Sequence, residues 1–549
     1  MTTHNAGSEL RSDESQRRSS LELDTDVLVL GGGPAGTWAA WSAASQGARV
    51  VLVDKGYCGT SGATAPSGVG VWYVPPDPAS RREARASREA LGGFLSERTW
   101  MDRVLDCTYD QMQRLGQWGY PFPLDAAGQP ARRSLQGPEY MRLMRKKVKA
   151  AGVRILDHSP ALELLVDDHG VAGAAGVSRQ EGFDYRVKAH AVVIATGGCA
   201  FLSRALGCNV LTGDGGLLAA EVGADLSGME FSNAYGIAPA FASVTKAAFY
   251  RFATFYYEDG REIPGAGSAR GRSIIAKTLL SQPVYACLDQ APESLRADLR
   301  ASQPNFFLPF DRAGIDPLTQ RFPITLRLEG TVRGTGGIRI AADDCATSVP
   351  GLYAAGDAAT RELICGGFTG GGSHNAAWAI SSGSWAGQGA ARHARTLGAP
   401  AASRNPRGAG RAALPAAGGA GTLDSEGVIR GVQAEVFPYD RNLFRTSVGL
   451  RDSLGRLHGL WGELQAPAGR GARELIRGRE AAAMLATARW MYASALERRE
   501  SRGMHKHLDY PELDAGQQRR LTCGGLDHVW VRAERSASIP SPSVVAAAE

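Results

Sequence analysis

A glycine-rich turn near the start of the chain constrains the fold more than any other feature. Residues 24–30 (DTDVLVL) have the composition of a buried parallel strand, and they run directly into 31–36 (GGGPAG). An alanine-rich helical stretch over 37–46 follows, and then a second strand over 48–53 that is closed by an acid. This order of strand, glycine turn, helix, strand and acid predicts a doubly wound α/β domain that binds a dinucleotide.

The glycines of this turn each have a physical task. Gly31 permits the tight turn, Gly33 lets the backbone approach a pyrophosphate, and Gly36 lets the helix pack closely on the strand. The helix N-terminus offers free N–H groups and a partial positive charge to phosphates. Asp54 closes the second strand, where a carboxylate can accept ribose hydroxyls. The motif by itself leaves open whether the dinucleotide is NAD or FAD.

Length and composition narrow the class of protein. The 549 residues exceed the roughly 100–200 of one domain, so at least two domains are expected. The net charge of +6 comes without a compact basic patch interleaved with aromatics, which argues against a nucleic-acid partner. The 8 cysteines form no C-x-x-C pair, so no metal site is expected and reduced thiols in the cytoplasm are the simpler interpretation. No apolar run is long enough for a membrane span.

Three later segments carry a resemblance to a known family. They are 195–198 (ATGG), 212–216 (TGDGG) and 351–357 (GLYAAGD), in this order, and 229–231 (MEF) and 500–514 (ESRGMHKHLDYPELD) extend the match. The chain resembles the succinate dehydrogenase and fumarate reductase flavoproteins, together with L-aspartate oxidase and adenylylsulfate reductase. The resemblance implies an FAD-binding doubly wound Rossmann-like α/β domain, an inserted α+β capping domain and a C-terminal helical domain.

The resemblance also implies where FAD would lie. The pyrophosphate is expected at the glycine turn, the ribose at Asp54, the ribitol near Asp357, and the isoalloxazine within the loop 55–64. A His in this loop bonds covalently to the flavin in the membrane-bound members; that place falls near Gly62 here, so non-covalent FAD is expected, with a link to Cys58 as the alternative. The expected FAD-binding residues are Gly31, Gly33, Pro34, Ala35, Gly36, Asp54, Lys55, Ser61, Gly62, Thr196, Gly197, Asp214, Asp357 and Asn375.

The chain departs from this family where the relatives hold a dicarboxylate with two His and two Arg. The segment 231–238 (FSNAYGIA) has no His, Val332 replaces the second His, and a Gly in 366–375 replaces one Arg. The other Arg, the expected proton donor, matches Arg272. Three further candidates for the catalytic group are Arg333 as a replacement cation, His374 as an acid/base group or helix-cap donor, and Tyr235 as a phenolic donor. One or two aromatics of 248–257 (AFYRFATFYY) are expected to wall a pocket.

The expected domain map has five parts. These are a disordered tail (1–23), the FAD-binding domain (24–231 and 325–395), the capping domain (232–324), a flexible linker rich in Ala, Gly, Pro and Arg (396–423) and the C-terminal helical domain (424–549).

The expected function is that of an FAD-dependent oxidoreductase. It would move a hydride between flavin N5 and a C–C or C–N bond of a small polar metabolite other than succinate, fumarate or aspartate. The second reactant would be dioxygen or a separate electron-transfer protein. One alternative is a catalytic subunit that works with a ferredoxin-like partner, which 381–384 (SSGS) favours because it resembles adenylylsulfate reductase. Another is a non-catalytic, flavin-bound assembly protein. The sequence leaves the oligomeric state open.

Overall fold

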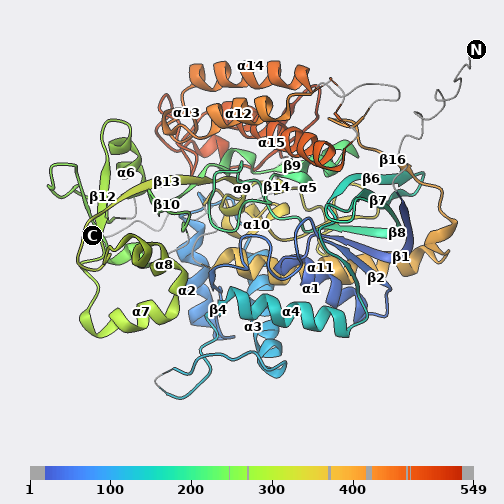
Figure 1. The fold of residues 1–549 in the computed structure, drawn as a ribbon, viewed down its shortest axis with the longest axis horizontal. Helices are drawn as coiled ribbons and strands as arrows, with labels where there is room; N and C mark the ends of the chain where they lie inside the picture. The colour runs from blue at the N-terminus through green and yellow to red at the C-terminus, as the bar shows by residue number, and fades with distance from the viewer. Residues whose placement is uncertain are drawn as a thin grey trace, which may run out of the picture.

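A mostly parallel sheet forms the centre of the computed structural model, which describes residues 19–125, 127–245, 248–268, 271–368, 373–415, 423–464, 466, 468–469 and 471–534. Its parallel strands pair in the order β15, β8, β1, β2, β5, and the antiparallel strands β7, β6 and β16 continue it beyond the other part of β8 (Figure 1). The strands are β1 (Ser20–Leu30), β2 (Val50–Val53), β5 (Arg154–Leu156), β6 (Ala161–Asp167), β7 (Gly170–Val177), β8 (Asp184–Ile194), β15 (Leu352–Ala354) and β16 (Arg407–Gly408). The apolar run 27–30 is almost fully buried, as expected for a strand covered on both faces.

Helices cover one face of this sheet. Helix α1 (Pro34–Ala44) packs against α11 (His374–Leu397), and α3 (Arg98–Gln117) and α4 (Gly137–Ala150) pack against these two. A side chain at Gly383 or Gly387 of α11 would place its Cβ 2.4 Å from the carbonyl oxygen of Ala35 or 2.2 Å from that of Ala39. Glycine at both positions therefore lets the two helices touch along their backbones.

The capping domain is an antiparallel sheet with helices, as expected. The strand order is β10 (Ala234–Pro239), β13 (Phe322–Glu329), β12 (Val284–Cys287) and β11 (Thr254–Tyr256). Its helices are α6 (Gly271–Leu279), α7 (Arg296–Ser302) and α8 (Pro304–Ala313). Strand β13 continues beyond the predicted boundary at residue 324.

The C-terminal region is helical over most of its length. Its helices are α12 (Ser425–Val436), α13 (Tyr439–Asn442), α14 (Ser447–Glu463) and α15 (Ala472–Glu497). After α15 the chain forms two further strands, β17 (Leu521–Gly524) and β18 (Trp530–Ala533). They form one sheet with β9 (Leu226–Ser227) and β14 (Gly337–Ile338), which come from earlier parts of the chain. Smaller elements are β3 (Gly68–Gly70), β4 (Ser134–Gln136), α2 (Pro78–Glu89), α5 (Asp214–Glu221), α9 (Gly330–Arg333) and α10 (Glu362–Cys365).

The structure differs from the predicted tail and linker. Strand β1 already begins at Ser20, and the rest of the predicted tail, 1–18, lies outside the described residues. Over 397–415 the predicted linker packs on the sheet: Arg404, 9% exposed, forms an ion pair with Asp167 and donates to the carbonyl oxygen of Ala189 at 3.0 Å. The guanidinium of Arg404 has five N–H donors, so it can hydrogen-bond to buried carbonyl oxygens that the small apolar residues of this segment cannot satisfy. Residues 416–422 lie outside the description.

None of the helices in the described part of the chain combines the length and the apolar composition needed to cross a membrane.

Candidate cofactor and substrate site

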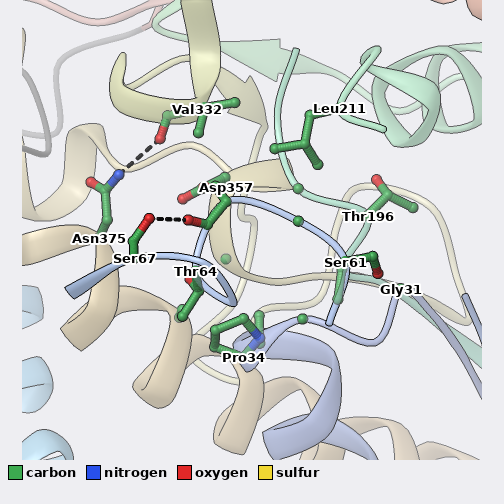
Figure 2. Close-up of a pocket in the computed structure, with 18 of the residues that line it drawn as sticks. Gly31, Pro34, Ser61, Thr64, Ser67, Thr196, Leu211, Val332, Asp357 and Asn375 are labelled. Atoms are coloured by element: carbon green, nitrogen blue, oxygen red, sulfur yellow. Dashed lines mark hydrogen bonds between the residues drawn. The ribbon is translucent and has the colours of Figure 1, made fainter. Parts of the chain in front are cut away.

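A cavity of about 680 Å³ lies where β1, β2 and β8 end and extends to the capping domain (Figure 2). The carboxyl ends of parallel strands are where open α/β sheets bind their ligands. Every predicted cofactor residue except Gly36 lines this cavity. Gly36 lies behind it, where a Cβ would be 1.8 Å from the carbonyl oxygen of Gly31, so it serves the close packing of helix on turn.

The glycine turn presents bare backbone to the cavity. Gly31 has a φ of +106°, and a Cβ there would lie 2.3 Å from the carbonyl oxygen of Ala195, so only glycine fits. A Cβ on Gly33 would meet no atom within 4 Å, because it would point into open space at the N-terminus of α1. The turn therefore leaves room for a group that approaches the helix N-terminus closely, as a pyrophosphate does.

Asp54 is held by the loops that surround it. Its Oδ1 accepts from the Gly56 N–H at 2.7 Å and from the Ser61 hydroxyl at 2.9 Å, and its Oδ2 accepts from the Gly32 N–H. Burial raises the pKa of this carboxyl, although these hydrogen bonds oppose the shift. A carboxylate has about four acceptor sites, so one remains for a ribose hydroxyl.

A polar group closes the cavity beside α5. Lys55 Nζ lies 2.8 Å from Asp214 Oδ2 and 2.7 Å from Glu480 Oε1, and it donates to Thr212 at 2.7 Å. Glu480 belongs to α15, so this ion pair connects the C-terminal helices to the cavity wall.

Asn375 is positioned by the backbone of α9, and Asp357 by the side chain of Arg361. The Asn375 amide donates to the carbonyl oxygen of Val332 at 2.8 Å (Figure 2), and Arg361 lies 2.6 Å from Asp357 Oδ1. The Thr196 hydroxyl is buried and has no hydrogen-bond partner within the described residues. Thr196 therefore offers a polar atom to a ligand in this part of the cavity.

Arg272 and Arg333 both reach the cavity from its cap side. Arg333 is paired with Glu329 at 3.0 Å, and the same carboxylate accepts from Thr245 at 2.8 Å. Arg272 makes no hydrogen bond or ion pair with any part of the chain that the structure describes. Although its side chain is exposed, desolvation by the surrounding protein, followed by the charge of Arg333, lowers the pKa of Arg272 to about 10. At neutral pH it therefore faces the cavity as a charged group that is available to a ligand.

Tyr235 and His374 do not occupy the positions expected of catalytic groups. The Tyr235 hydroxyl donates to the carbonyl oxygen of Val436 at 2.8 Å, and the residue does not line the cavity. His374 is 1% exposed and lies behind the wall, with its ring centroid 4.5 Å from that of Trp72. Ser373 occupies the N-cap position of α11, and His374 is the first residue of the helix.

Several residues of the cavity wall were not predicted individually. The most informative is Tyr250, whose hydroxyl is buried and has no hydrogen-bond partner among the described residues. Burial raises its pKa, so it is a neutral donor at physiological pH. The aromatic run 248–257 was the only sequence signal for it. Other wall residues that were not predicted individually are Thr64, which ends the predicted loop 55–64, and Ser67, Arg133, Tyr140, Ile237, Thr245 and Gln303.

Comparisons with known proteins agree with this geometry. A family model described as an FAD binding domain matches residues 26–235, and one described as the fumarate reductase flavoprotein C-terminus matches 438–532. The L-aspartate oxidase of Streptomyces coelicolor is 27% identical over 91% of this chain and 91% of its own length. A fumarate reductase (CoM/CoB) subunit of Methanothermobacter marburgensis is 24% identical over 89% of this chain and 95% of its own length.

The chain belongs to the succinate dehydrogenase/fumarate reductase flavoprotein family. It is an FAD-dependent oxidoreductase. FrdA from E. coli quinol fumarate reductase shares the fold of this flavoprotein with a TM-score of 0.79 at 20% identity, covering 95% of this chain and 98% of that one. Adenylylsulfate reductase from Archaeoglobus fulgidus shares it with a TM-score of 0.76 at 19% identity, covering 98% and 99%. The predicted fold class, family and cofactor are thereby confirmed.

The cavity of this flavoprotein fits FAD in its chemistry as well as its size. A dinucleotide would satisfy the bare backbone at Gly33, the remaining acceptor site of Asp54 and the Thr196 hydroxyl, which has no hydrogen-bond partner among the described residues. Gly62, at the predicted place of a covalent His, has a φ of +87° and no atom within 4 Å of a built Cβ. The alternative link to Cys58 is disfavoured by its position: the thiol is fully buried outside the cavity wall, and burial raises its pKa to about 12.

Proposed function

We propose that this flavoprotein oxidises or reduces a C–C or C–N bond of a small polar metabolite other than succinate, fumarate or aspartate. The observation that carries the proposal is the make-up of the cavity wall toward the cap: Val332 and Ile237 are apolar, Arg333 is already paired with Glu329, and Arg272 is left to meet a charged group. A second carboxylate placed against the two apolar side chains would have no charged partner from them. Leaving such a group unpaired costs about 1–3 kcal/mol or more for each missing donor.

Arg272 and Tyr250 are the groups proposed to act on the substrate. When bound, FAD supplies the two-electron redox chemistry. Arg272 holds a negatively charged or carbonyl oxygen with its guanidinium fork, or delivers a proton at the substrate carbon, and it remains charged below pH about 10. The Tyr250 hydroxyl donates a hydrogen bond to a second polar atom and so fixes the orientation of the substrate. Non-covalent FAD is part of this proposal.

Anaerobic bleaching of the flavin absorbance by a panel of metabolites tests the function. Succinate and L-aspartate should leave the oxidised protein yellow, and fumarate should not reoxidise it after chemical reduction. A polar metabolite that bleaches it identifies the substrate. Turnover of a dicarboxylate at a typical enzymatic rate, roughly 1–1000 per second, would refute the proposal. A protein that responds to no candidate would favour the non-catalytic assembly protein.

Arg272→Lys tests the residue, with Arg261→Lys as its matched control. Arg261 lies in the same capping domain, pairs with Asp259 and does not line the cavity. Lysine keeps the charge but loses the fork, so the Arg272 variant should keep FAD and lose turnover by roughly 100-fold or more. The control should lose neither. Normal turnover of Arg272→Lys would make this residue an ordinary cation of the cavity wall.

The second reactant is proposed to be dioxygen or a separate electron-transfer protein. Both alternatives have a relative that supports them: one is named an oxidase, and another is named as one subunit of a larger enzyme. Stopped-flow reoxidation of the reduced flavin by dioxygen and by a ferredoxin distinguishes them. A cytoplasmic location is proposed because the eight cysteines, all of them in the described part, form no disulfide.

A further inference from the structure

Six of the ten tryptophans stand in two clusters on the helices that hold the cofactor cavity. Trp38, Trp41 and Trp118 form the first cluster, on α1 and at the end of α3. Trp100, Trp378 and Trp385 form the second, on α3 and α11. Indole and phenol are among the protein side chains that lose one electron most readily, so their contacts have chemical as well as packing consequences.

The first cluster connects the cavity to the surface without a break. Tyr140 lines the cavity, and its hydroxyl oxygen accepts a hydrogen bond from the Trp38 indole at 2.8 Å. Trp38 is fully buried, and its ring stacks on Trp118 at 5.4 Å between centroids and 20° between planes. Trp118 is partly exposed and also contacts Trp41 at 4.8 Å. Each neighbouring pair of rings is therefore in direct contact or joined by one hydrogen bond.

We propose that Tyr140, Trp38 and Trp118 form a one-electron route that leads oxidising equivalents out of the FAD cavity. Trp38 gives one electron, through Tyr140, to a one-electron oxidant in the cavity, such as a radical derived from dioxygen or light-excited isoalloxazine. Trp118 then transfers one electron to the oxidised Trp38 across the stacked pair of rings. The Trp118 indole N–H releases its proton to water, and a thiol in solution returns a hydrogen atom to the indolyl radical and becomes a thiyl radical. The oxidant gains one electron, the thiol loses one, and the protein is restored.

Cations over the outer rings support release of the proton at this end. Lys147 Nζ lies 5.3 Å from the Trp118 centroid, and the Arg114 guanidinium carbon lies 4.9 Å from that of Trp41. A cation over the ring face favours the electron-rich neutral indole and opposes a positive charge on it. An oxidised Trp118 is therefore driven to lose its proton, so the outer end of the route carries a neutral radical.

The second cluster supplies a matched comparison within the same domain. Trp378 donates to the carbonyl oxygen of Gly356 at 3.1 Å but does not itself line the cavity. Trp100 lies 5.9 Å from Trp378 and 5.7 Å from Trp385 between centroids, and neither pair is stacked. Arg103 stands over both Trp100, at 4.4 Å, and Trp385, at 4.3 Å. The second cluster therefore starts outside the cavity and has no stacked pair among its described ring contacts, whereas cations lie over rings of both clusters.

The test is a blue-light flash on the FAD-loaded, full-length chain without dioxygen. Transient absorption and electron paramagnetic resonance should detect a tryptophan radical that added thiol removes. Trp38→Phe and Trp118→Phe should reduce the yield of the long-lived radical to the detection limit, whereas Trp378→Phe should leave it unchanged. Mass spectrometry after prolonged illumination without thiol should find the oxidation products on Trp118.

Three results would overturn the proposal. They are the absence of a tryptophan radical in the unaltered protein, an unchanged yield in both Trp38→Phe and Trp118→Phe, and a loss caused by Trp378→Phe instead. If Trp38→Phe does not retain FAD, Trp118→Phe decides the matter alone, because its ring lies at the protein surface and away from the cavity wall. These readouts do not depend on the substrate, so they stand or fall separately from the proposed reaction.

Discussion

Glu362→Gln should make the protein more stable at alkaline pH and remove part of its pH dependence. Glu362 begins α10 and is fully buried beside a second buried acid, Glu230. Glu230 is held by Arg498 at 2.7 Å, and Glu362 accepts from the Ser227 hydroxyl. Glu230 Oε2 and Glu362 Oε1 have no hydrogen-bond partner in the described chain. Burial, and then the charge of Glu230, raises the pKa of Glu362 from 4.5 to about 8.

The magnitude follows from the difference between the folded and unfolded pKa of Glu362. One pKa unit corresponds to about 1.4 kcal/mol, so a rise from 4.5 to about 8 is worth about 5 kcal/mol. The folded state retains this proton and the unfolded state releases it, so the free energy of unfolding decreases as the pH rises from about 4.5 to about 8. Because Glu230 shares the titration, about 5 kcal/mol is a ceiling. Glutamine stays neutral over this whole pH range.

Urea unfolding followed by tryptophan fluorescence at a series of pH values measures the effect. The variant and the unaltered protein should be similar near pH 4.5, and the variant should be increasingly more stable up to about pH 8. Glu435→Gln is the control of opposite sign: burial alone would raise the pKa of Glu435, but hydrogen bonds from Arg456 and Ser453 lower it. The unaltered protein gains stability from Glu435 as the pH rises through the carboxyl range, so this variant should fall increasingly below it. Parallel pH curves for Glu362→Gln and the unaltered protein would refute the reasoning.

Three further experiments test the cavity. Gly33→Val should give folded but colourless protein, because the valine side chain would fill the space through which the pyrophosphate approaches the turn. Its control, Gly459→Val on the exposed face of α14, should stay yellow. Full flavin content in Gly33→Val would contradict the assignment of the turn. Acid precipitation should release intact FAD into the supernatant. Flavin that stays with the precipitated chain would support a covalent bond to Cys58 instead. Tyr250→Phe should keep FAD but lower kcat/KM by roughly 10-fold, the value of one hydrogen bond of about 1.5 kcal/mol, and an unchanged kcat/KM would remove Tyr250 from the substrate site.

The strand, turn and helix around 24–54 could be predicted because their determinants are local. Apolar runs, glycines and a closing acid lie within a single βαβ unit, and the structure places them as expected, with β1, α1 and β2 shifted by a few residues at their ends. The residues that line the cavity from distant motifs, such as Asp214 and Asn375, were predicted through the family resemblance. Their spacing along the chain carries no geometric information of its own.

Tyr235 shows why the cap side could not be predicted in the same way. Its position in β10 corresponds to a family segment that contacts substrate, but its direction is decided by the carbonyl oxygen of Val436 at the end of α12. That contact joins parts of the chain that lie far apart in sequence. The packing of the described part of the linker could not be predicted for a related reason: the partners of Arg404 belong to β6, β7 and β8, which lie far away in the sequence.

The segment 381–384 shows that a motif shared with a relative can be explained by packing alone. The Ser382 hydroxyl accepts from the Gly356 N–H at 3.0 Å and donates to the carbonyl oxygen of Trp378, so it connects α11 to the loop after β15. Gly383 provides the close approach of α1 described above. These contacts position the cavity wall, so the packing of α1 on α11 accounts for the segment without a substrate. The resemblance to adenylylsulfate reductase at this segment therefore says nothing about the substrate, and the choice between reactions rests on Arg272, Tyr250 and the apolar residues of the cavity wall.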